Sequence, residues 1–124
     1  MTNASDDEFT FRRLESTDFD KGFLEVLKGL TKVGDTTKAQ FQHRFSEMFP
    51  RLEEIYKVIV VEDVQRGVII GTGTLLLKKK FIFQSGTTAH YTNIVVDKTY
   101  RGKNLGRYIV ELLKSVAEAN GCFD

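Results

Sequence analysis

The residues best suited to chemistry form one short basic stretch, residues 101–107, with the sequence RGKNLGR. It joins a β-branched run to an amphipathic run, so a strand should lead almost directly into a helix. The first N–H groups of a helix have no partner within it, and the positive end of the helix dipole adds to their attraction for anions. The two glycines let the backbone approach a ligand closely, and the three basic side chains suit a pyrophosphate. The stretch therefore predicts an anion-binding loop, although a solvated basic turn tightened by glycine would carry the same residues.

Other chemistries find less support in the sequence. The stretch lacks both the Gly-Lys-Ser/Thr of a Walker A loop and the G-x-G-x-x-G of a dinucleotide-binding turn. Residues 78–80 are lysines next to Phe81 and could form a basic–aromatic strip for nucleic acid, but a net charge of +1 gives no broad attraction to it. His43 and His90 lie far apart and Cys122 is the single cysteine, so we expect neither a metal site nor an internal disulfide.

The strands that would position the loop follow from short β-branched or alternating runs. These runs predict strands at 9–14, 56–62, 68–77 and 89–96, the middle two joined as a hairpin. After the loop, apolar residues at helical spacing predict an amphipathic helix over 107–120. With helices early and three consecutive strands before the last helix, the order of elements indicates an α+β fold.

Two helices are expected between the first and second strands. Apolar residues recur at helical spacing after a cap at Ser16 or Thr17, which predicts a first helix that ends near Gly34. The pair Thr37 and Gln40 resembles a capping box and predicts a second helix. The only proline, Pro50, ends this helix or follows its end.

Bulk properties set the remaining limits. A chain of 124 residues forms at most one domain, and its 41% hydrophobic and 28% charged content is ordinary for a globular protein. No apolar run approaches the roughly 18 residues of a membrane span, so we expect no membrane partner. Residues 1–8 are polar and acidic, unlike a secretory signal, and we expect a flexible tail before a single domain at 9–124. The lone cysteine fits a reducing compartment, so we expect a cytoplasmic protein.

Three segments carry a resemblance to a known family. The loop, preceded by Val95-Val96-Asp97, resembles the acetyl-CoA signature Q/R-x-x-G-x-G/A of the GNAT N-acetyltransferases, with Asn104 in place of the central glycine. FRRLESTDFDKGFLEVLKGLTKVG, LLLKKKFIF and AHYTNIVVDKTYRGKNLG resemble successive pieces of the eukaryotic glucosamine 6-phosphate N-acetyltransferases. The resemblance covers residues 9–124.

The resemblance implies a fold and an activity. The fold is the GNAT fold, a mixed central sheet flanked by helices. The activity is direct acetyl transfer from acetyl-CoA to an amino sugar phosphate, glucosamine 6-phosphate, as in UDP-GlcNAc biosynthesis. The enzyme of this family would be a homodimer that uses acetyl-CoA as co-substrate and no metal.

The resemblance also implies roles for particular residues. The backbone of Ile94, Val95 and Val96 would pair with the pantetheine arm, and the N–H near Ile94 would polarise the thioester carbonyl as the catalytic group. The pyrophosphate would be held by the loop residues, Arg101, Gly102, Lys103, Asn104, Leu105, Gly106 and Arg107. The acceptor-site positions, among which Lys80 suits a sugar phosphate, are Thr31, Lys80, Phe81, Thr92 and Asn93.

Three departures from the family pattern leave an alternative open. Thr92-Asn93 stands where the family has Glu-Asp, and neutral side chains cannot pair with an ammonium group. Phe83 replaces a histidine. The C-terminal third of the family, with its next strand, the tyrosine that protonates the thiolate and the segment given to the dimer partner, is expected to be missing after the cofactor-binding helix. The alternative is a non-catalytic GNAT-like protein that binds CoA or a partner chain, or an inactive fragment.

Overall fold

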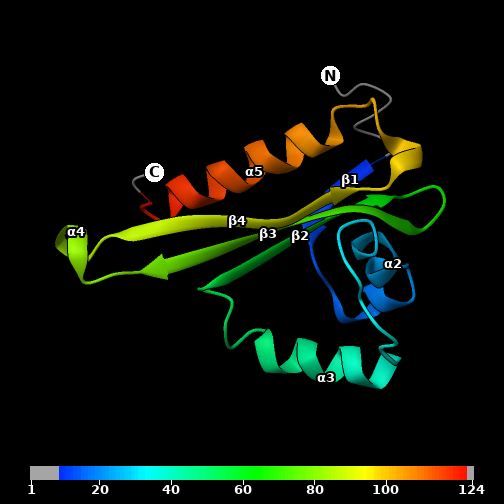
Figure 1. Ribbon diagram of the computed structural model, residues 1–124, viewed down its shortest axis with the longest axis horizontal. Helices are drawn as coiled ribbons and strands as arrows, with labels where there is room; N and C mark the ends of the chain where they lie inside the picture. The colour runs from blue at the N-terminus through cyan, green and yellow to red at the C-terminus, as the bar shows by residue number, and fades with distance from the viewer. Residues whose placement is uncertain (1–8, 123–124) are drawn as a thin grey trace.

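The sheet is the centre of the molecule. The computed structural model describes residues 9–122, and residues 1–8, predicted as a tail, and 123–124 lie outside it. Four strands pair in the order β1-β2-β3-β4, with every neighbouring pair antiparallel (Figure 1). Their bounds are Phe9–Arg13, Tyr56–Asp63, Val68–Lys79 and Thr87–Val96.

The α+β class is confirmed by this arrangement. The mixed sheet expected from the resemblance is antiparallel in the described part, where the parallel contact is an isolated bridge between Thr87 and Cys122. The expected hairpin of β2 and β3 is present, and β3 also pairs with β4. β3 extends to Lys79, and a short helix, α4 (Ile82–Ser85), lies at the tip of the β3–β4 hairpin (Figure 1).

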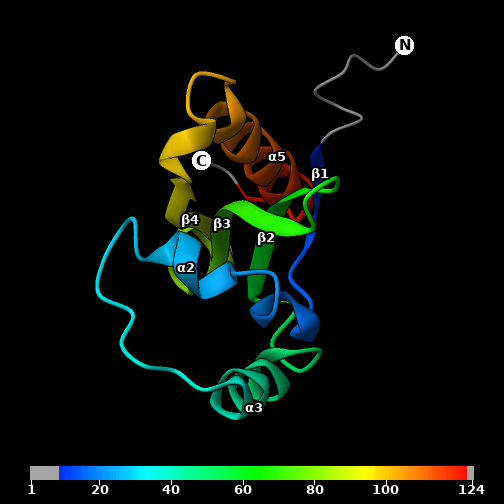
Figure 2. The same ribbon diagram turned by 90° about the vertical axis from the view of Figure 1, so that its right-hand side faces the viewer.

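Helices cover both faces of the sheet. Helix α5 (Leu105–Ala119) lies on one face, while α2 (Phe23–Leu27) and α3 (Lys38–Met48) lie on the other (Figures 1 and 2). The α5 residues that are buried against the sheet recur every four residues along one side of the helix: Leu105, Ile109, Leu113 and Ala117. This stripe is the apolar face that the sequence predicted, although the helix begins two residues earlier than expected.

A glycine lets α5 lie close to β3. A Cβ built at Gly73 would come within 2.5 Å of Ile109 Cγ2 and 3.1 Å of Leu113 Cδ1. Any side chain at this position would push the helix away from the strand. Gly73 therefore sets how closely α5 packs against β3, the strand that pairs with β4.

The prediction of one continuous first helix is wrong. The expected helix is split into a 3-10 helix, η1 (Ser16–Phe19), and α2, with Gly22 between them at φ +86°. A left-handed residue cannot continue a right-handed helix, so the chain turns there although the apolar spacing continues. Glu15 is the N-cap in place of Ser16 or Thr17, and α2 ends at Leu27, well before Gly34.

The predicted capping box is confirmed. Thr37 Oγ1 accepts a hydrogen bond from the backbone N–H of Gln40 at 3.1 Å, and Gln40 Oε1 accepts one from the N–H of Thr37 at 2.9 Å. These two bonds satisfy donors that helix α3 cannot pair internally. The helix ends at Met48, just before Pro50.

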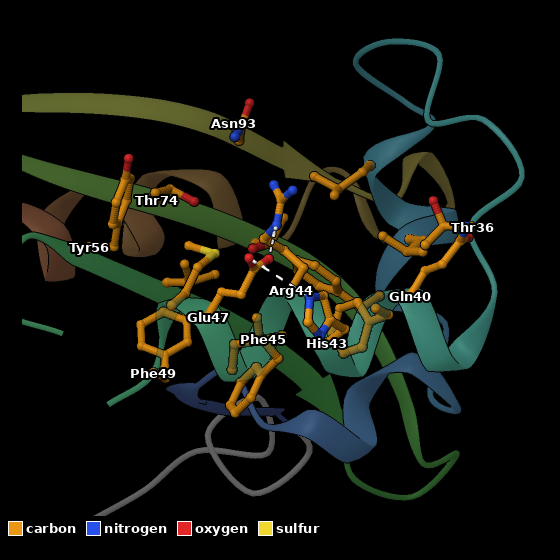
Figure 3. Close-up of a pocket in the computed structure, with 18 of the residues that line it drawn as sticks. Thr36, Gln40, His43, Arg44, Phe45, Glu47, Phe49, Tyr56, Thr74 and Asn93 are labelled. Atoms are coloured by element: carbon orange, nitrogen blue, oxygen red, sulfur yellow. Dashed lines mark hydrogen bonds and ion pairs between the residues drawn. The ribbon is translucent and has the colours of Figure 1, made fainter. Parts of the chain in front are cut away.

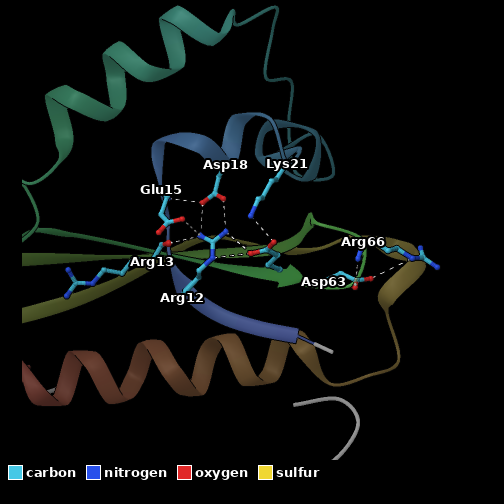
Figure 4. Close-up of polar contacts among 8 residues, drawn as sticks. Arg12, Arg13, Glu15, Asp18, Lys21, Asp63 and Arg66 are labelled. Carbon is cyan, nitrogen blue, oxygen red and sulfur yellow. Dashed lines mark hydrogen bonds and ion pairs between the residues drawn. The ribbon is translucent and has the colours of Figure 1, made fainter. Parts of the chain in front are cut away.

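A network of ion pairs holds η1 against the sheet (Figure 4). Arg12 on β1 donates to both oxygens of Asp18 at 2.9 and 2.8 Å and to Glu62 on β2 at 2.9 Å. Lys21 donates to the other oxygen of Glu62 at 2.9 Å. Since Asp18 is fully buried, its pairing with Arg12 is what allows this carboxylate to lie in the interior.

Candidate active site

The loop between β4 and α5 has a defined start. Asp97 caps a single 3-10 turn, η2 (Lys98–Tyr100), by accepting hydrogen bonds from the Thr99 N–H at 2.9 Å and the Thr99 hydroxyl at 2.8 Å. These bonds hold the pKa of Asp97 below its usual range, so the carboxylate stays charged as a cap. The Asp97 N–H donates to Ile70 O on β3 at 2.8 Å, which joins the start of the loop to the sheet.

Two left-handed residues shape the middle of the loop. Gly102 has φ +90° and Asn104, the N-cap of α5, has φ +62°. Asparagine tolerates this region better than most residues, which explains how it serves where the family signature has glycine. Arg101 and Lys103 are exposed beside them, while Leu105 is buried and begins the helix.

The two ends of the predicted basic stretch differ in their surroundings. Arg107 is exposed but its Nε lies 3.0 Å from Glu111 Oε1, so this charge is partly neutralised. A Cβ at Gly106 would meet only Val96 Cγ2, at 3.8 Å, which is an ordinary contact. Packing within the protein therefore does not require a glycine at position 106, whereas the close approach of a ligand to the backbone would.

A β-bulge interrupts β4 just before the loop. Thr92 pairs with Thr74 and Val95 with Thr72, so Asn93 and Ile94 together lie opposite the single residue Gly73. Asn93 has φ +55°, as the extra residue of such a bulge often requires. The bulge was not predicted from the sequence, where its only local signal is an asparagine within a β-branched run. Bulges of this kind are frequent beside active sites, where they redirect backbone groups and side chains.

A cleft of about 960 Å³ lies between α3 and the face of the sheet that carries this bulge (Figure 3). Its walls are mainly apolar, and Thr92 and Asn93 line the β4 side. On the α3 side, Arg44 points across the cleft toward β4, and its Nε lies 3.0 Å from Glu47 Oε1 (Figure 3). His43 lines the same side. An arginine, a histidine, two carboxylates and several hydroxyls thus surround an apolar space large enough for a sugar.

The structure brings together only some of the predicted acceptor residues. Thr92 and Asn93 line the cleft. Lys80 and Phe81 lie at the tip of the β3–β4 hairpin, six residues beyond Thr74, which is about 20 Å along an extended strand. Thr31 is exposed after α2 and is not among the residues that line the cleft. Within one protomer, the five positions therefore do not form a single small-molecule site.

Two further properties concern the described residues alone. Among residues 9–122, no three His, Cys, Asp or Glu side chains are grouped so that they could hold a metal ion. No helix within the same residues has the length and apolar character needed to cross a membrane.

The comparison with known proteins decides the family. The model of the acetyltransferase (GNAT) family matches residues 23–124, which is most of the chain. The chain belongs to the GNAT family. The resemblance to the GNAT family seen in the loop and in the flanking segments is therefore confirmed, while the anion-binding role of the loop stays a prediction.

Three proteins similar to this GNAT chain carry the same name, glucosamine 6-phosphate N-acetyltransferase. Glucosamine 6-phosphate N-acetyltransferase 1 of Dictyostelium discoideum is 42% identical over 99% of this chain and 77% of its own length. A probable glucosamine 6-phosphate N-acetyltransferase of Drosophila melanogaster is 41% identical over 90% of this chain and 50% of its own length. The crystal structure of glucosamine-6-phosphate N-acetyltransferase from Arabidopsis thaliana superposes with a TM-score of 0.89 at 36% identity, covering 93% of this chain and 78% of that one. The GNAT fold is confirmed by this superposition.

Proposed function

We propose that this GNAT chain transfers the acetyl group of acetyl-CoA to the amine of glucosamine 6-phosphate, giving N-acetylglucosamine 6-phosphate. The observation that carries the proposal is its 42% identity, over 99% of the chain, to a glucosamine 6-phosphate N-acetyltransferase. The geometry supports this function, because β4 connects the two candidate binding regions. Thr92 on β4 lines the cleft, the loop follows the end of β4, and the bulge lies between Thr92 and Val95.

The residues of the loop fit the cofactor that GNAT acetyltransferases use, acetyl-CoA. Backbone N–H groups of residues 101–107, with Arg101 and Lys103, would hold the pyrophosphate. The backbone of Ile94, Val95 and Val96 would pair with the pantetheine arm, since among the described residues β4 has a neighbouring strand on its β3 side only. The space above Gly106 supports a close approach of the pyrophosphate to the helix start.

The chemistry of acetyl transfer indicates which catalytic role the backbone of β4 would have. The amine nitrogen of the sugar forms a bond to the thioester carbonyl carbon, the C–S bond breaks, and a proton leaves the amine while one reaches the thiolate. The reaction passes through no covalent intermediate with the enzyme. We propose that the N–H of Ile94, on the bulge, polarises the thioester carbonyl, because oriented backbone donors stabilise charge that develops on an oxygen.

The acceptor would bind on the other side of β4. Thr92 and Asn93 can hydrogen-bond the sugar hydroxyls from the wall of the cleft. Lys80, suited to the sugar phosphate, and Phe81 are too distant along the strand to meet the same sugar within one protomer. We therefore propose a homodimer in which the hairpin tip of one protomer reaches the acceptor site of the other. Placement in UDP-GlcNAc biosynthesis and in the cytoplasm is part of the same proposal. The single cysteine of the sequence, Cys122, is compatible with a reducing compartment.

Charge reversal in the loop tests the proposal. The double variant Arg101→Glu/Lys103→Glu should raise the Kd of CoA at least tenfold, because each lost charge-assisted hydrogen bond is worth about 1.5–3 kcal/mol. Isothermal titration calorimetry measures the Kd, and transfer from acetyl-CoA to glucosamine 6-phosphate is assayed in parallel. Arg51→Glu/Lys114→Glu, an equal change of charge at exposed positions on other elements, serves as the control.

The two readouts separate the possible functions. Unchanged CoA affinity in the loop variant would contradict the location of the cofactor site. CoA binding without any acetyl transfer to glucosamine 6-phosphate would instead favour the non-catalytic alternative.

A further inference from the structure

A tyrosine immediately before the loop makes contacts that are unusual for a surface turn. Tyr100 is the last residue of η2, and its hydroxyl donates a 2.8 Å hydrogen bond to Asp63 Oδ2 at the end of β2, 37 residues away in sequence. Its ring meets Phe9 on β1 edge to face, with centroids 6.0 Å apart. Arg66, in the β2–β3 turn, donates to the same hydroxyl at 3.2 Å, and its guanidinium lies 5.9 Å from the centre of the ring.

The carboxylate that accepts this hydrogen bond is buried. Asp63 is only 7% exposed, and a buried carboxylate left without donors is strongly destabilised. The other contacts of the Asp63 carboxylate are longer, and both are made by Arg66. The backbone nitrogen of Arg66 lies 3.4 Å from Asp63 Oδ1, and its Nε lies 3.8 Å from Asp63 Oδ2 (Figure 4). Burial, and after it the hydrogen bond to Asp63, raises the pKa of Tyr100, so the hydroxyl stays protonated and able to donate.

The residues that follow Tyr100 have little else to hold them. Residues 101–104 are all exposed, and a Cβ built at Gly102 would meet no atom of another residue within 4 Å, its chain neighbours apart. The chain becomes buried again only at Leu105. The position of the loop is thus set by Leu105 at the start of the helix and by the η2 turn, which Asp97 joins to Ile70 and Tyr100 joins to Asp63.

A cavity behind the loop gives it room to move. It has a volume of about 380 Å³, and its lining includes Asp63, Arg66, Tyr100 and Lys103. If the hydroxyl of Tyr100 were removed, the turn could shift into this space. A binding loop that must be ordered at the moment of binding loses affinity, because the cost of ordering is subtracted from the binding free energy.

We propose that Tyr100, through its hydrogen bond to buried Asp63, is a positioning residue that holds the 101–107 loop in place for the pyrophosphate of CoA. This inference rests on the function proposed above. Tyr100 itself touches neither reactant. It acts through the loop backbone, by fixing where the N–H groups of the loop lie before the cofactor arrives.

Tyr100→Phe is the direct test, because it removes the hydroxyl and keeps both ring contacts. The Kd of CoA should rise about tenfold, equivalent to 1.4 kcal/mol. The KM for acetyl-CoA should rise in proportion, with little change in kcat at saturation. With acetyl-pantetheine, a donor that has no pyrophosphate, kcat/KM should be unchanged. Tyr108→Phe is the matched control, since Tyr108 is a half-exposed tyrosine on α5 with an edge-to-face contact to Phe11.

A second variant keeps the test informative if the first loses stability. Asp63→Asn removes the charge of the acceptor, and it should weaken CoA binding in the same donor-selective way. Combined with Tyr100→Phe it should add little, because both changes disturb one interaction. Wild-type affinity for CoA in Tyr100→Phe, or equal losses with acetyl-CoA and acetyl-pantetheine, would overturn the positioning role. If the unaltered chain bound no CoA at all, the proposed function would fail first and this inference with it.

Discussion

Arg12 is the residue on which the packing of η1 depends. Hydrogen bonding to Asp18, followed by that to Glu62, raises the pKa of Arg12 above its usual value, so its charge is permanent. The hydrogen bond from Lys21 is the largest cause that holds the pKa of Glu62 below its usual range, and Arg12 adds to it. A carboxylate with a lowered pKa stabilises the folded state fully above its ordinary pKa. That stabilisation is lost as the pH falls through the lowered value.

Glu62→Gln should therefore lower stability in a pH-dependent way. At pH 7 we expect a loss of about 1–3 kcal/mol in the free energy of unfolding, since two cations lose a charged partner. The difference from wild type should stay constant down to about pH 5 and shrink below about pH 4, where the wild-type carboxylate becomes protonated. Urea unfolding at several pH values measures it. Glu25→Gln, in an exposed pair with Lys28, is the control and should change stability by less than about 1 kcal/mol.

Single residues of the site could be predicted only where neighbours in sequence are also neighbours in space. The loop from Arg101 to Gly106 meets that condition for its backbone, which turns at Gly102, while its role as an anion site stays a prediction. Arg44 and Glu47 do not meet the condition, because whether the polar side of a helix faces solvent or a cleft depends on how the helix packs. The partial neutralisation of Arg107 by Glu111, by contrast, lies within one helix at the i, i+4 spacing and could have been predicted.

At the scale of elements, the predictions held where local chemistry determines structure. The capping box at Thr37 fixed the start of α3 because both of its hydrogen bonds are local. The first helix failed because apolar spacing alone does not reveal that Gly22 adopts a left-handed conformation. The bulge at Asn93 is a shift in the pairing register between β3 and β4. Such a shift depends on both strands, so the sequence of β4 alone does not predict it.

The contact between β3 and α5 yields a prediction that compares two glycines. Gly73→Ala should destabilise the fold by about 1–3 kcal/mol, because its Cβ would overlap Ile109. Gly71→Ala, two residues earlier on β3, should be neutral or slightly stabilising, because the nearest atoms to its Cβ lie at 3.4 Å. Thermal or urea unfolding of the two variants measures the difference. Equal stabilities would mean that α5 can move away from the sheet without cost.

At the scale of the whole molecule, two apolar surfaces among the described residues bear on the proposed function. One is the cleft between α3 and the sheet, and the other is the tip of the β3–β4 hairpin, where Phe81 is 98% and Ile82 60% exposed. Large apolar side chains grouped on a surface commonly mark an interface. In a symmetric dimer each contact occurs twice, so a tip that reaches the partner buries its side chains in both copies.

The proposed homodimer predicts that the hairpin tip controls both assembly and activity. Phe81→Ser/Ile82→Ser should weaken dimerisation by about a hundredfold or more, since burial of each such side chain is worth about 1.5–3 kcal/mol. Acetyl transfer to glucosamine 6-phosphate should fall with the dimer fraction, while CoA binding by each protomer should persist because the loop belongs to a single chain. Analytical ultracentrifugation over a range of protein concentrations measures the first effect. Val64→Ser, which removes an apolar residue that is 50% exposed in the β2–β3 turn, is the control. A fully active monomer would show that Lys80 and Phe81 take no part in the acceptor site of another protomer, and that the cleft beside Thr92 and Asn93 binds the sugar phosphate by itself.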